Sequence, residues 1–444
     1  TLGEMAWSYA EAVQFVYRLV NYERTVCYKY ENTFKLDRVH RILKALGDPH
    51  RDFPSVHIAG TKGKGSTASM VASVLRRAGY KVGLYTSPHL ISFRERIRTD
   101  GRPISEEAFA GLMAEISSLV TFSPEGRSSH SFFDVLTAAA FLHFRREAVD
   151  WAVVEVGMGG RLDATNVLVP RLCVITPISY DHMRFLGNTL SEIAAEKAGI
   201  LKPGVPVVVA PQQEEALRVI REVARERGAP LVEVEGSYRW KRVAMEEGGD
   251  AFRIDGPEGR YEVLLPLLGE HQGLNAAVAV AAVDVLRDQG VNVPREAVLE
   301  GLSSVRILGR ISVVRTDPAV IVDVAHNGAS VEQLRRVLEE RFLKRGKFLL
   351  VFALLKDKDL PRIAQILGPV AHRAFLPYLD TPRAMPPERI RDVLSGYVPC
   401  ELCGTAGKAI SKALEAAGPK DVVGIVGSFM LAEQAVYYFG LEVP

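Results

Sequence analysis

The sequence feature that most limits the possible folds is residues 56–67, in which a short apolar run leads into a glycine-rich turn that begins at residue 60. Residues 56–59 form a short apolar run with β-branched members, which predicts a strand, and residues 68–78 have a helix-forming composition. Glycine allows backbone N–H groups to converge on an anion, and the following helix turns its positive end toward the same point. This strand, loop and helix therefore predict a phosphate-binding site.

The loop residues are, in order, Gly60, Thr61, Lys62, Gly63, Lys64, Gly65, Ser66 and Thr67. Lys64 adds a movable positive charge, and Ser66 or Thr67 offers a hydroxyl to a Mg²⁺ ion bound to the phosphates. The strict pattern G-x-x-x-x-G-K-[ST] is not met, because Ile58 stands at its first glycine and Gly65 separates Lys64 from Ser66. We interpret the stretch as a variant phosphate loop; the alternative is a lysine-rich surface turn.

Length and charge exclude several classes of protein. A chain of 444 residues exceeds the size at which one hydrophobic core usually stops growing, so we expect two domains. The net charge is +2 and no block of lysine and arginine marks a nucleic-acid or membrane surface, so we expect small-molecule partners. We also expect a monomer. No apolar run approaches the roughly 18 residues of a transmembrane helix, and the N-terminal residues lack a secretory pattern. We therefore expect a cytoplasmic protein that binds neither nucleic acid nor membranes.

The four cysteines are too few for a disulfide framework in a chain of this length. Cys400 and Cys403 have the spacing of a zinc or redox pair, but no second pair and no nearby histidine completes a tetrahedral site. We expect these two cysteines to have a structural role.

The order of apolar runs predicts an α/β fold. Strands are expected at residues 81–86, 151–156, 172–176 and 205–209, with helical patterns between them. Polar residues gather after these strands, which is typical of a doubly wound sheet whose ligands lie along the carboxyl edge. The run 93–98 is too charged for a core and is predicted to be a loop near that edge.

The remaining chain predicts an insertion and a second domain. Residues 231–267 alternate over short runs, which predicts a small antiparallel β insertion in the first domain. A second alternation of strands and helices is expected after it, with strands at residues 311–315, 320–324, 348–352, 374–376 and 422–426. We predict a P-loop sheet domain over residues 1–308 and a smaller, Rossmann-like α/β domain over residues 309–444.

Two side chains that would bind a metal ion are expected at the phosphate edge of the first sheet. Glu155 closes one strand, and His182 lies beyond the end of the next. A hard cation prefers oxygen ligands, so a carboxylate, a hydroxyl such as Ser87 and one imidazole would hold Mg²⁺ against phosphates. The alternatives are a Glu155 paired with an arginine and a His182 that is simply hydrogen-bonded.

Further candidates lie at a helix end and in the second domain. Lys197 is surrounded by small residues, where a desolvated amine loses its proton more readily; the alternative is an ordinary helix-end cation. Asp323 and His326 follow a predicted strand, although Asn327 and its neighbours would equally cap the next helix. Together with Arg310, we expect these side chains to complete the site across a cleft.

Several ordered segments of this sequence resemble the folylpolyglutamate synthases and dihydrofolate synthases, which are related to the peptidoglycan Mur ligases. The resemblance covers nearly the whole chain and is carried by residues 60–66, 86–90, 93–97, 155–166, 181–182, 196–202, 271–275, 309–310, 323–327 and 355–359. The sequence departs from the family pattern at Lys62, which replaces an asparagine, at Leu308, which replaces a proline, and at residues 353–355. No departure removes a predicted ligand, although Lys62 adds charge close to the phosphates.

The resemblance implies an ATP-dependent ligase that joins L-glutamate to the carboxylate of a folate or of dihydropteroate through an acyl phosphate. It implies that Lys64 and the loop amides hold the β- and γ-phosphates. It also implies that Ser87, Glu155 and His182 bind Mg²⁺, with one or two ions in the site.

The resemblance assigns roles to five further residues. Lys197 matches a lysine that is carbamylated in the family, which would turn a cation into an anion able to hold the second Mg²⁺. Asn275, Arg310 and Asp323 match nucleotide contacts, and His326 matches a histidine beside the nucleotide and the glutamate.

The segments that match the pterin-binding part of the family are Ser131, Phe132, Phe133, Leu162, Asp163 and Ala164. An aromatic pair packs well on a flat ring, and a carboxylate accepts the ring's N–H donors. For the two phenylalanines, core packing is the alternative. Two rival functions also stay open, a Mur-type ligase for nucleotide-sugar peptides and a nucleotide-gated P-loop binding module.

Overall fold

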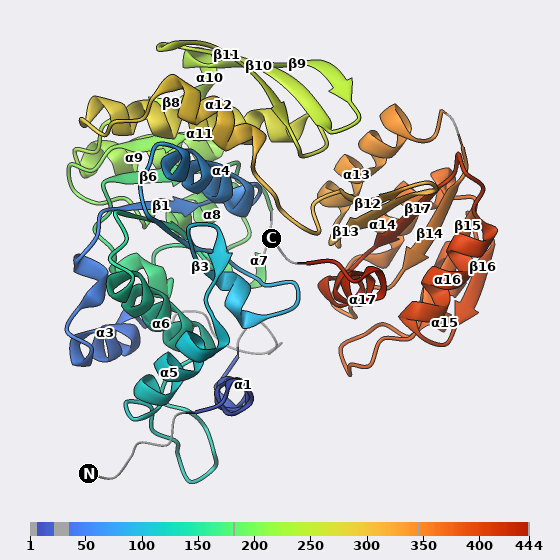
Figure 1. The fold of residues 1–444 in the computed structure, drawn as a ribbon, viewed down its shortest axis with the longest axis horizontal. Helices are drawn as coiled ribbons and strands as arrows, with labels where there is room; N and C mark the ends of the chain where they lie inside the picture. Colours follow the sequence, from blue (N-terminus) through green and yellow to red (C-terminus); the bar gives the residue numbers. More distant parts are fainter. Residues whose placement is uncertain (1–6, 22–34, 181–182, 345, 443–444) are drawn as a thin grey trace. The chain divides into compact units, whose positions relative to one another are not determined.

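The computed structural model describes residues 7–21, 35–180, 183–344 and 346–442, and within these ranges the chain forms two compact units (Figure 1). As far as described, unit 1 consists of Thr1–Val243, Ala251–Leu264 and Gly273–Val305, and unit 2 of Ala244–Asp250, Leu265–Gln272 and Arg306–Pro444. Compactness alone does not establish an independent domain. The predicted domain ranges 1–308 and 309–444 therefore stay a prediction.

Unit 1 is built on an eight-stranded sheet with the order β4-β3-β2-β5-β1-β6-β7-β8. Its strands are β1 (Ser55–Ala59), β2 (Val82–Tyr85), β3 (Ile97–Thr99), β4 (Arg102–Pro103), β5 (Trp151–Glu155), β6 (Leu172–Ile175), β7 (Val207–Val209) and β8 (Leu231–Glu233). From β2 to β8 in this order the strands run parallel, and β3 and β4 add an antiparallel edge. Residues that follow the parallel strands therefore gather at one edge, as a doubly wound sheet requires.

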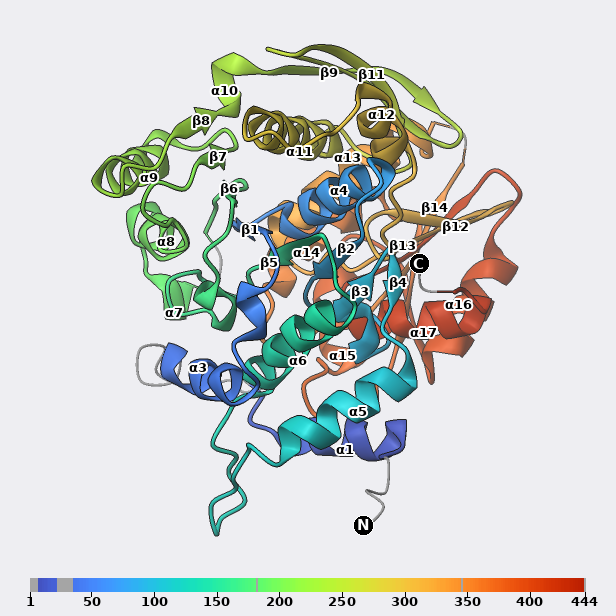
Figure 2. The same ribbon diagram turned by 60° about the vertical axis from the view of Figure 1, so that its left-hand side comes forward.

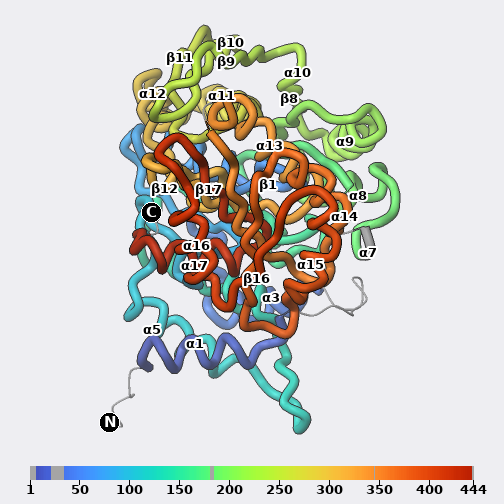
Figure 3. The backbone as a smooth tube through the Cα atoms, turned by 90° about the vertical axis from the view of Figure 1, so that its right-hand side faces the viewer, coloured from blue at the N-terminus to red at the C-terminus, as the bar shows by residue number. Residues whose placement is uncertain are grey.

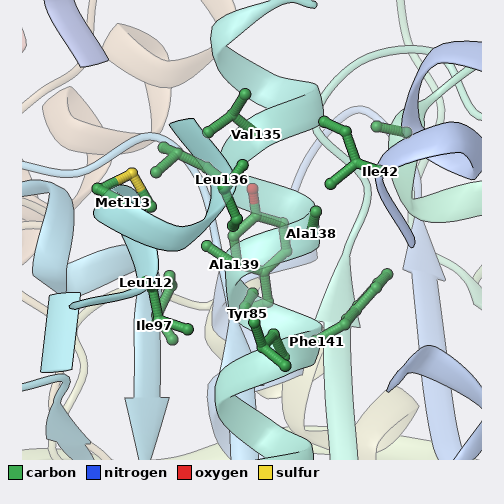
Figure 4. Packing of buried hydrophobic residues seen from close by; sticks show 14 of the residues in the cluster. Ile42, Tyr85, Ile97, Leu112, Met113, Val135, Leu136, Ala138, Ala139 and Phe141 are labelled. Atoms are coloured by element: carbon green, nitrogen blue, oxygen red, sulfur yellow. The ribbon is translucent and has the colours of Figure 1, made fainter. Parts of the chain in front are cut away.

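Helices cover both faces of this sheet. The described helices that lie wholly or mainly in unit 1 are α1 (Tyr9–Arg18), α3 (Leu36–Ala45), α4 (Lys64–Arg77), α5 (Glu106–Ser117), α6 (Phe132–Arg146), α7 (Met183–Leu186), α8 (Leu190–Ala198), α9 (Glu214–Glu226), α10 (Val234–Ser237), α11 (His271–Asp288) and α12 (Arg295–Ser303). Ala152 and Val154 of β5 join a core with α3, α5 and α6, whose packing Figure 4 shows. Side chains alternate along a strand, so Glu155 faces the other side, where it meets Gly65 of α4. Figure 2 shows α4, α11 and α12 on that side and α3, α5 and α6 opposite.

The predicted β insertion is a three-stranded sheet with the order β11-β10-β9, and it begins at residue 239. The predicted start at residue 231 is wrong, because residues 231–233 form β8, which pairs in parallel with β7 in the eight-stranded sheet. Its strands are β9 (Arg239–Glu246), β10 (Gly249–Gly256) and β11 (Gly259–Leu265). Two residues connect each strand to the next, and so short a connection joins only antiparallel strands. The Ala244–Asp250 end of this sheet belongs to unit 2, where Arg341 donates hydrogen bonds to the buried carboxylate of Asp250 and, at 2.7 Å, to the carbonyl of Gly249.

The loop predicted at residues 93–98 is wrong, because the charged run forms a 3₁₀ turn (Phe93–Arg96) that leads into β3. Arg96 is 1% exposed and Glu95 is 7% exposed. The Glu95 carboxylate accepts hydrogen bonds from three main-chain amides, those of residues 90–92. The Arg96 guanidinium lies 4.9 Å from the ring centroid of Phe132, and its Nε donates to Nδ1 of His89 at 2.8 Å. Both charges enter the core because hydrogen bonds compensate them.

Unit 2 contains a six-stranded sheet with the order β12-β13-β17-β14-β15-β16. In Figure 3 this unit is the orange to red part of the tube. Its strands are β12 (Ser312–Thr316), β13 (Ala319–Asp323), β14 (Phe348–Phe352), β15 (Arg373–Pro377), β16 (Cys400–Cys403) and β17 (Val422–Val426), and its helices are α13 (Gly328–Arg341), α14 (Leu360–Leu367), α15 (Pro387–Leu394), α16 (Ala406–Ala416) and α17 (Phe429–Phe439). β12 pairs antiparallel with β13, and the other strands pair parallel. The predicted second α/β fold is thereby confirmed.

The Cys400–Cys403 pair lies within β16, where residues three apart face opposite sides of the sheet. The thiol of Cys400 donates to the carbonyl of Val398 at 3.3 Å, and that of Cys403 donates to the carbonyl of Glu401 at 3.6 Å. Such an arrangement suits packing and not a shared metal. In the described ranges, no helix combines the length and the apolar character that crossing a membrane demands.

Candidate active site

Two glycines of the phosphate loop stand where a side chain would collide with its neighbours. Gly60 has a φ of +146°, and a Cβ atom there would lie 1.9 Å from Oγ1 of Thr176. Gly63 has a φ of +80°, and a Cβ atom there would lie 2.2 Å from Oδ1 of Asn275. The loop therefore packs directly against the residue that follows β6 and against α11, and glycine is required by close approach as well as by backbone conformation.

The loop amides divide into two groups, which the sequence did not predict. The amides of Thr61 and Lys62 donate to the carbonyl of Pro177 at 3.0 and 3.1 Å, and so anchor the loop to the segment after β6. Helix α4 begins at Lys64, so its first-turn amides have no acceptor within the helix and carry the positive end of its dipole. Among the loop amides that are predicted to hold phosphate, those of Thr61 and Lys62 already donate within the protein, whereas those at the start of α4 have no such partner within the helix.

Glu155 and Ser87 lie beside this loop. Glu155 is 4% exposed, and its Oε2 accepts a hydrogen bond of 3.0 Å from the amide of Ser87. The same oxygen lies 3.3 Å from the position a Cβ atom would take on Gly65. Ser66 and Thr67, in the first turn of α4, are buried. The fold thus brings together the carboxylate and hydroxyl oxygens that a hard cation prefers.

Lys197 is a buried lysine and not an ordinary helix-end cation. It lies near the end of α8, is 4% exposed, and donates from Nζ to the carbonyl of Gly60 at 2.8 Å. It shares a cavity of about 30 Å³ with Gly60, Thr61, Lys64 and residues 156–159. Lys64 and Lys197, which are far apart in the sequence, therefore line one small space beside the loop.

His182 and its neighbour Asp181 lie outside the described residues. Within the described part of the chain, no group of three or more His, Cys, Asp or Glu side chains is arranged to hold a metal ion. The predicted Mg²⁺ ligands, which are Ser66, Ser87, Glu155, His182 and Lys197, therefore stay a prediction.

In the first predicted pterin segment, Ser131 and Phe132 are buried and Phe133 is half-buried. Ser131 caps α6 and exchanges hydrogen bonds of 2.7 and 3.1 Å with Asp134. Phe132 is 2% exposed and belongs to the core, which favours the packing alternative for this ring. Phe133 is half-buried, and its ring tip lies 2.5 Å from the position of a Cβ atom on Gly157. Phe133 is thus the aromatic side chain that borders the loop after β5.

Asp163 is an almost fully buried carboxylate at the start of a 3₁₀ turn (Ala164–Val167), with Leu162 half-buried and Ala164 buried beside it. Its oxygens accept hydrogen bonds from the amide of Met158 at 2.9 Å, from the amide of Thr165 at 3.0 Å and from the hydroxyl of Thr165. Burial raises the pKa of Asp163 to about 6, although these hydrogen bonds act to lower it.

Sequence reasoning missed Thr165 and the histidine that contacts it, His57, although a histidine within an apolar strand was a visible signal.

The candidate residues of unit 2 lie at the carboxyl end of β13. Asp323 is 6% exposed and accepts hydrogen bonds from the amides of Ile311 at 2.6 Å and Ala325 at 2.5 Å. Burial raises the pKa of Asp323 to about 6, while the positive charge of Arg310 opposes the shift. Asn327 caps α13, as its structural alternative predicted.

His326 is half-buried, and its Nδ1 lies 2.8 Å from the carbonyl oxygen of Val324. A carbonyl only accepts, so Nδ1 carries the ring proton when the imidazole is neutral, and Nε2 then offers a lone pair. The histidine can therefore accept a hydrogen bond or a proton at Nε2.

Two family models match the chain. One, described as the Mur ligase middle domain, matches residues 58–283, and the other, described as the Mur ligase glutamate ligase domain, matches residues 309–429. The first match spans the phosphate loop, Glu155, Lys197 and Asn275. The second spans Arg310, Asp323 and His326.

Curated relatives carry two activities in their names. The dihydrofolate synthase/folylpolyglutamate synthase of Bacillus subtilis is 38% identical over 79% of this chain and 82% of its own length. The protein of the same name from Escherichia coli is 35% identical over 89% of this chain and 88% of its own length.

Solved structures agree with these relatives. Folylpolyglutamate synthase of Mycobacterium tuberculosis, in complexes with ADP and AMPPCP, is 33% identical, with a TM-score of 0.85 over 94% of this chain and 97% of that one. Escherichia coli FolC in complex with DHPP and ADP is 31% identical, with a TM-score of 0.84 over 98% of both chains. The chain therefore belongs to the folylpolyglutamate synthase and dihydrofolate synthase family of the Mur ligases.

Proposed function

We propose that the protein is an ATP-dependent ligase that joins L-glutamate to the carboxylate of a folate or of dihydropteroate and releases ADP and phosphate. The observation that carries this proposal is the meeting of the glycine loop with the buried Glu155, whose Oε2 lies 3.3 Å from the Cβ position of Gly65. A phosphate loop alone suits any nucleotide-binding protein. A buried carboxylate beside it, in a chain of this family, supports phosphoryl transfer.

The reaction has two balanced steps. A substrate carboxylate oxygen attacks the γ-phosphorus of ATP, the bond to the β-bridging oxygen breaks, and ADP leaves from an acyl phosphate. The glutamate amine then attacks the acyl carbon, loses a proton and expels phosphate with its bonding electron pair. In this scheme Lys64 and the first-turn amides of α4 neutralise the negative charge of the reacting phosphates.

The oxygen-rich surroundings of Glu155 suit a magnesium ion. We propose that Glu155, the hydroxyls of Ser66 and Ser87, and His182 hold it. Mg²⁺, when bound, offsets phosphate charge and orients the phosphates. The chain's own part is to keep these oxygens fixed, since Glu155 is held by the amide of Ser87 at 3.0 Å.

We further propose roles for the remaining family-matched residues. Asn275, against which the loop packs at Gly63, and Arg310 and Asp323 in unit 2 would contact the nucleotide. His326 would act through Nε2 on the glutamate side. Phe133, Leu162 and Asp163 would contact the pterin, with Ser131, Phe132 and Ala164 supporting them.

The proposed function is tested by incubating the protein with ATP, L-glutamate and either tetrahydrofolate or dihydropteroate, and by measuring ADP and the glutamylated product. We expect ADP formation that depends on glutamate and on one or both pterin substrates. Turnover with a UDP-sugar peptide alone would favour the Mur-type alternative. Nucleotide binding without glutamate-dependent ADP formation would favour the binding-module alternative. Comparing the two pterin substrates decides between dihydrofolate synthase, folylpolyglutamate synthase and both.

We also propose that Lys197 is carbamylated. Only a neutral amine captures CO₂, and Lys197 is 4% exposed among small residues, with its Nζ 2.8 Å from the carbonyl oxygen of Gly60. With ¹³CO₂ we expect a carbamate signal in ¹³C NMR of the wild type that Lys197→Arg lacks. We expect Lys197→Arg, which keeps the positive charge, to lower turnover about 100-fold, because it cannot supply the anion. Wild-type turnover in Lys197→Arg would contradict this assignment.

The raised pKa of Asp163 predicts opposite effects of pH on stability and on substrate binding. The pKa of Asp163 is about 6 in the folded chain, against an ordinary value of 3.8, so the folded state holds the proton more tightly. The carboxyl group's contribution to the free energy of unfolding is measured relative to Asp163→Asn. This contribution should be largest below the ordinary pKa of 3.8 and should be lost as the pH rises through the folded pKa of about 6. Pterin binding needs the ionised acceptor and should improve over the same interval. Thermal unfolding and KM measured across this range, in both proteins, check the two trends.

A further inference from the structure

His57, Thr165 and Asp163 form a buried hydrogen-bonded chain that joins β1 to the loop after β5. Nε2 of His57 lies 2.8 Å from Oγ1 of Thr165, and this hydroxyl donates to Oδ1 of Asp163. His57 and Thr165 are 0% exposed, and Asp163 is 3% exposed. His57 lies three residues before the phosphate loop, so the chain connects the strand that carries the loop with the predicted pterin segment.

The number of available protons fixes the direction of the chain. Threonine has one hydroxyl proton, which Thr165 gives to Asp163, so its oxygen accepts from His57. His57 must therefore carry its proton on Nε2. Its other nitrogen, Nδ1, is then an acceptor, and it has no hydrogen-bond partner among the described residues.

The surroundings keep the imidazole neutral. Burial lowers the pKa of His57 to about 3, and the positive charge of Lys202 acts in the same direction. The Nζ of Lys202 is held by the main-chain and side-chain oxygens of Asn166 at 2.8 and 2.9 Å. Within the described part of the chain, the carboxylate of Asp163 accepts hydrogen bonds from Thr165 and from the amides of residues 157 and 158. His57 is thus a fixed donor and takes no part in acid–base chemistry at neutral pH.

We propose that His57 is a positioning residue for the pterin-bearing substrate: through Thr165 it holds the Asp163 carboxylate ionised and in one orientation. This rests on the proposed function, in which Asp163 accepts hydrogen bonds from the pterin ring. Hydrogen bonds in a series polarise one another. The hydrogen bond that His57 donates to Thr165 therefore strengthens the one that Thr165 donates to Asp163. A buried carboxylate that loses this donor takes up a proton at higher pH and becomes a poorer acceptor.

The test compares Thr165→Val, which removes the hydroxyl, with Thr165→Ser, which keeps it. The KM values for tetrahydrofolate and for ATP are measured from about pH 5 to about pH 8. We expect Thr165→Val to raise the KM for tetrahydrofolate about tenfold and to move its acid limb to higher pH, with the KM for ATP changed less than about twofold. Thr165→Ser should keep the wild-type KM for tetrahydrofolate and the wild-type acid limb. His57→Leu should change both in the same direction as Thr165→Val. His57→Gln, whose amide can donate, should show a smaller change than His57→Leu.

An equal rise in both KM values, or an acid limb that does not move, would assign the chain a purely structural role and overturn the proposal. If Thr165→Val and His57→Leu do not fold, ¹⁵N NMR of the wild type decides. The Nε2–H tautomer of a neutral His57 is expected, and the Nδ1–H tautomer contradicts the donor chain. If the wild type forms no ADP in a glutamate-dependent way, the proposed function is refuted. The tautomer of His57 then still tests the direction of the hydrogen bonds from His57 through Thr165 to Asp163.

Discussion

Lys64→Ala is expected to lower the turnover number for glutamate-dependent ADP formation by about 100- to 1,000-fold. The side chain starts at the first residue of α4 and lines the cavity beside the phosphate loop and Lys197. Negative charge redistributes over the phosphates as the γ-phosphoryl group moves, and a lysine at the loop neutralises it at that moment. The turnover number is measured by stopping the reaction at set times and quantifying ADP. Thermal unfolding of the variant verifies that it is folded.

Lys62→Ala is the matched control, since it removes an equal charge two residues away in the same loop. The amide of Lys62 donates to the carbonyl of Pro177 at 3.1 Å, and an alanine keeps that anchor. We expect Lys62→Ala to change the KM for ATP by about fivefold at most and to leave the turnover number nearly unchanged. If both variants lose turnover equally, the role assigned to Lys64 is wrong and general loop charge explains the loss.

Gly63→Ala is expected to weaken nucleotide binding by at least about tenfold. The residue has a φ of +80°, and its new Cβ atom would lie 2.2 Å from Oδ1 of Asn275. Because the two groups cannot both keep their positions, either the loop or α11 must shift, and both are predicted to contact the nucleotide. Titration with ADP or a non-hydrolysable ATP analogue measures the loss.

Gly79→Ala provides the comparison at the other end of α4. Gly79 has a φ of +95°, and nothing lies within 4 Å of the position its Cβ atom would take. The two variants therefore carry similar backbone strain, roughly 1–2 kcal/mol, but only Gly63→Ala also collides with a neighbour. We expect Gly79→Ala to lower the melting temperature and to bind nucleotide like the wild type. Equal affinity in the two variants would show that close packing of the loop on Asn275 does not matter for binding.

The fold was predictable where a local pattern was sufficient. The strand before the loop was expected at residues 56–59 and is Ser55–Ala59, and the strand expected at 151–156 is Trp151–Glu155. Both runs are mainly apolar, as is typical of strands that are buried on two faces. Most of the insertion predicted at residues 231–267 was likewise visible, because half-buried antiparallel strands alternate, but its first residues form β8 of the parallel sheet.

The burial of charge was not predictable from the sequence. Residues 93–98 read as a solvated loop, yet Glu95 and Arg96 are in the core. Their partners are main-chain amides and the ring of Phe132, and their positions depend on how the whole unit folds. A charge becomes tolerable in a core only when such partners are in place.

The sequence by itself determined the phosphate loop, the parallel sheet that carries it and the family to which the chain belongs, because glycine spacing and apolar periodicity act over a few residues. Only the tertiary structure decided which loop amides are already engaged, that Lys197 is buried against Gly60, and that His57 contacts Thr165. The physical reason is range. A backbone preference is local, whereas a hydrogen bond between residues 108 positions apart exists only after the sheet has brought them together.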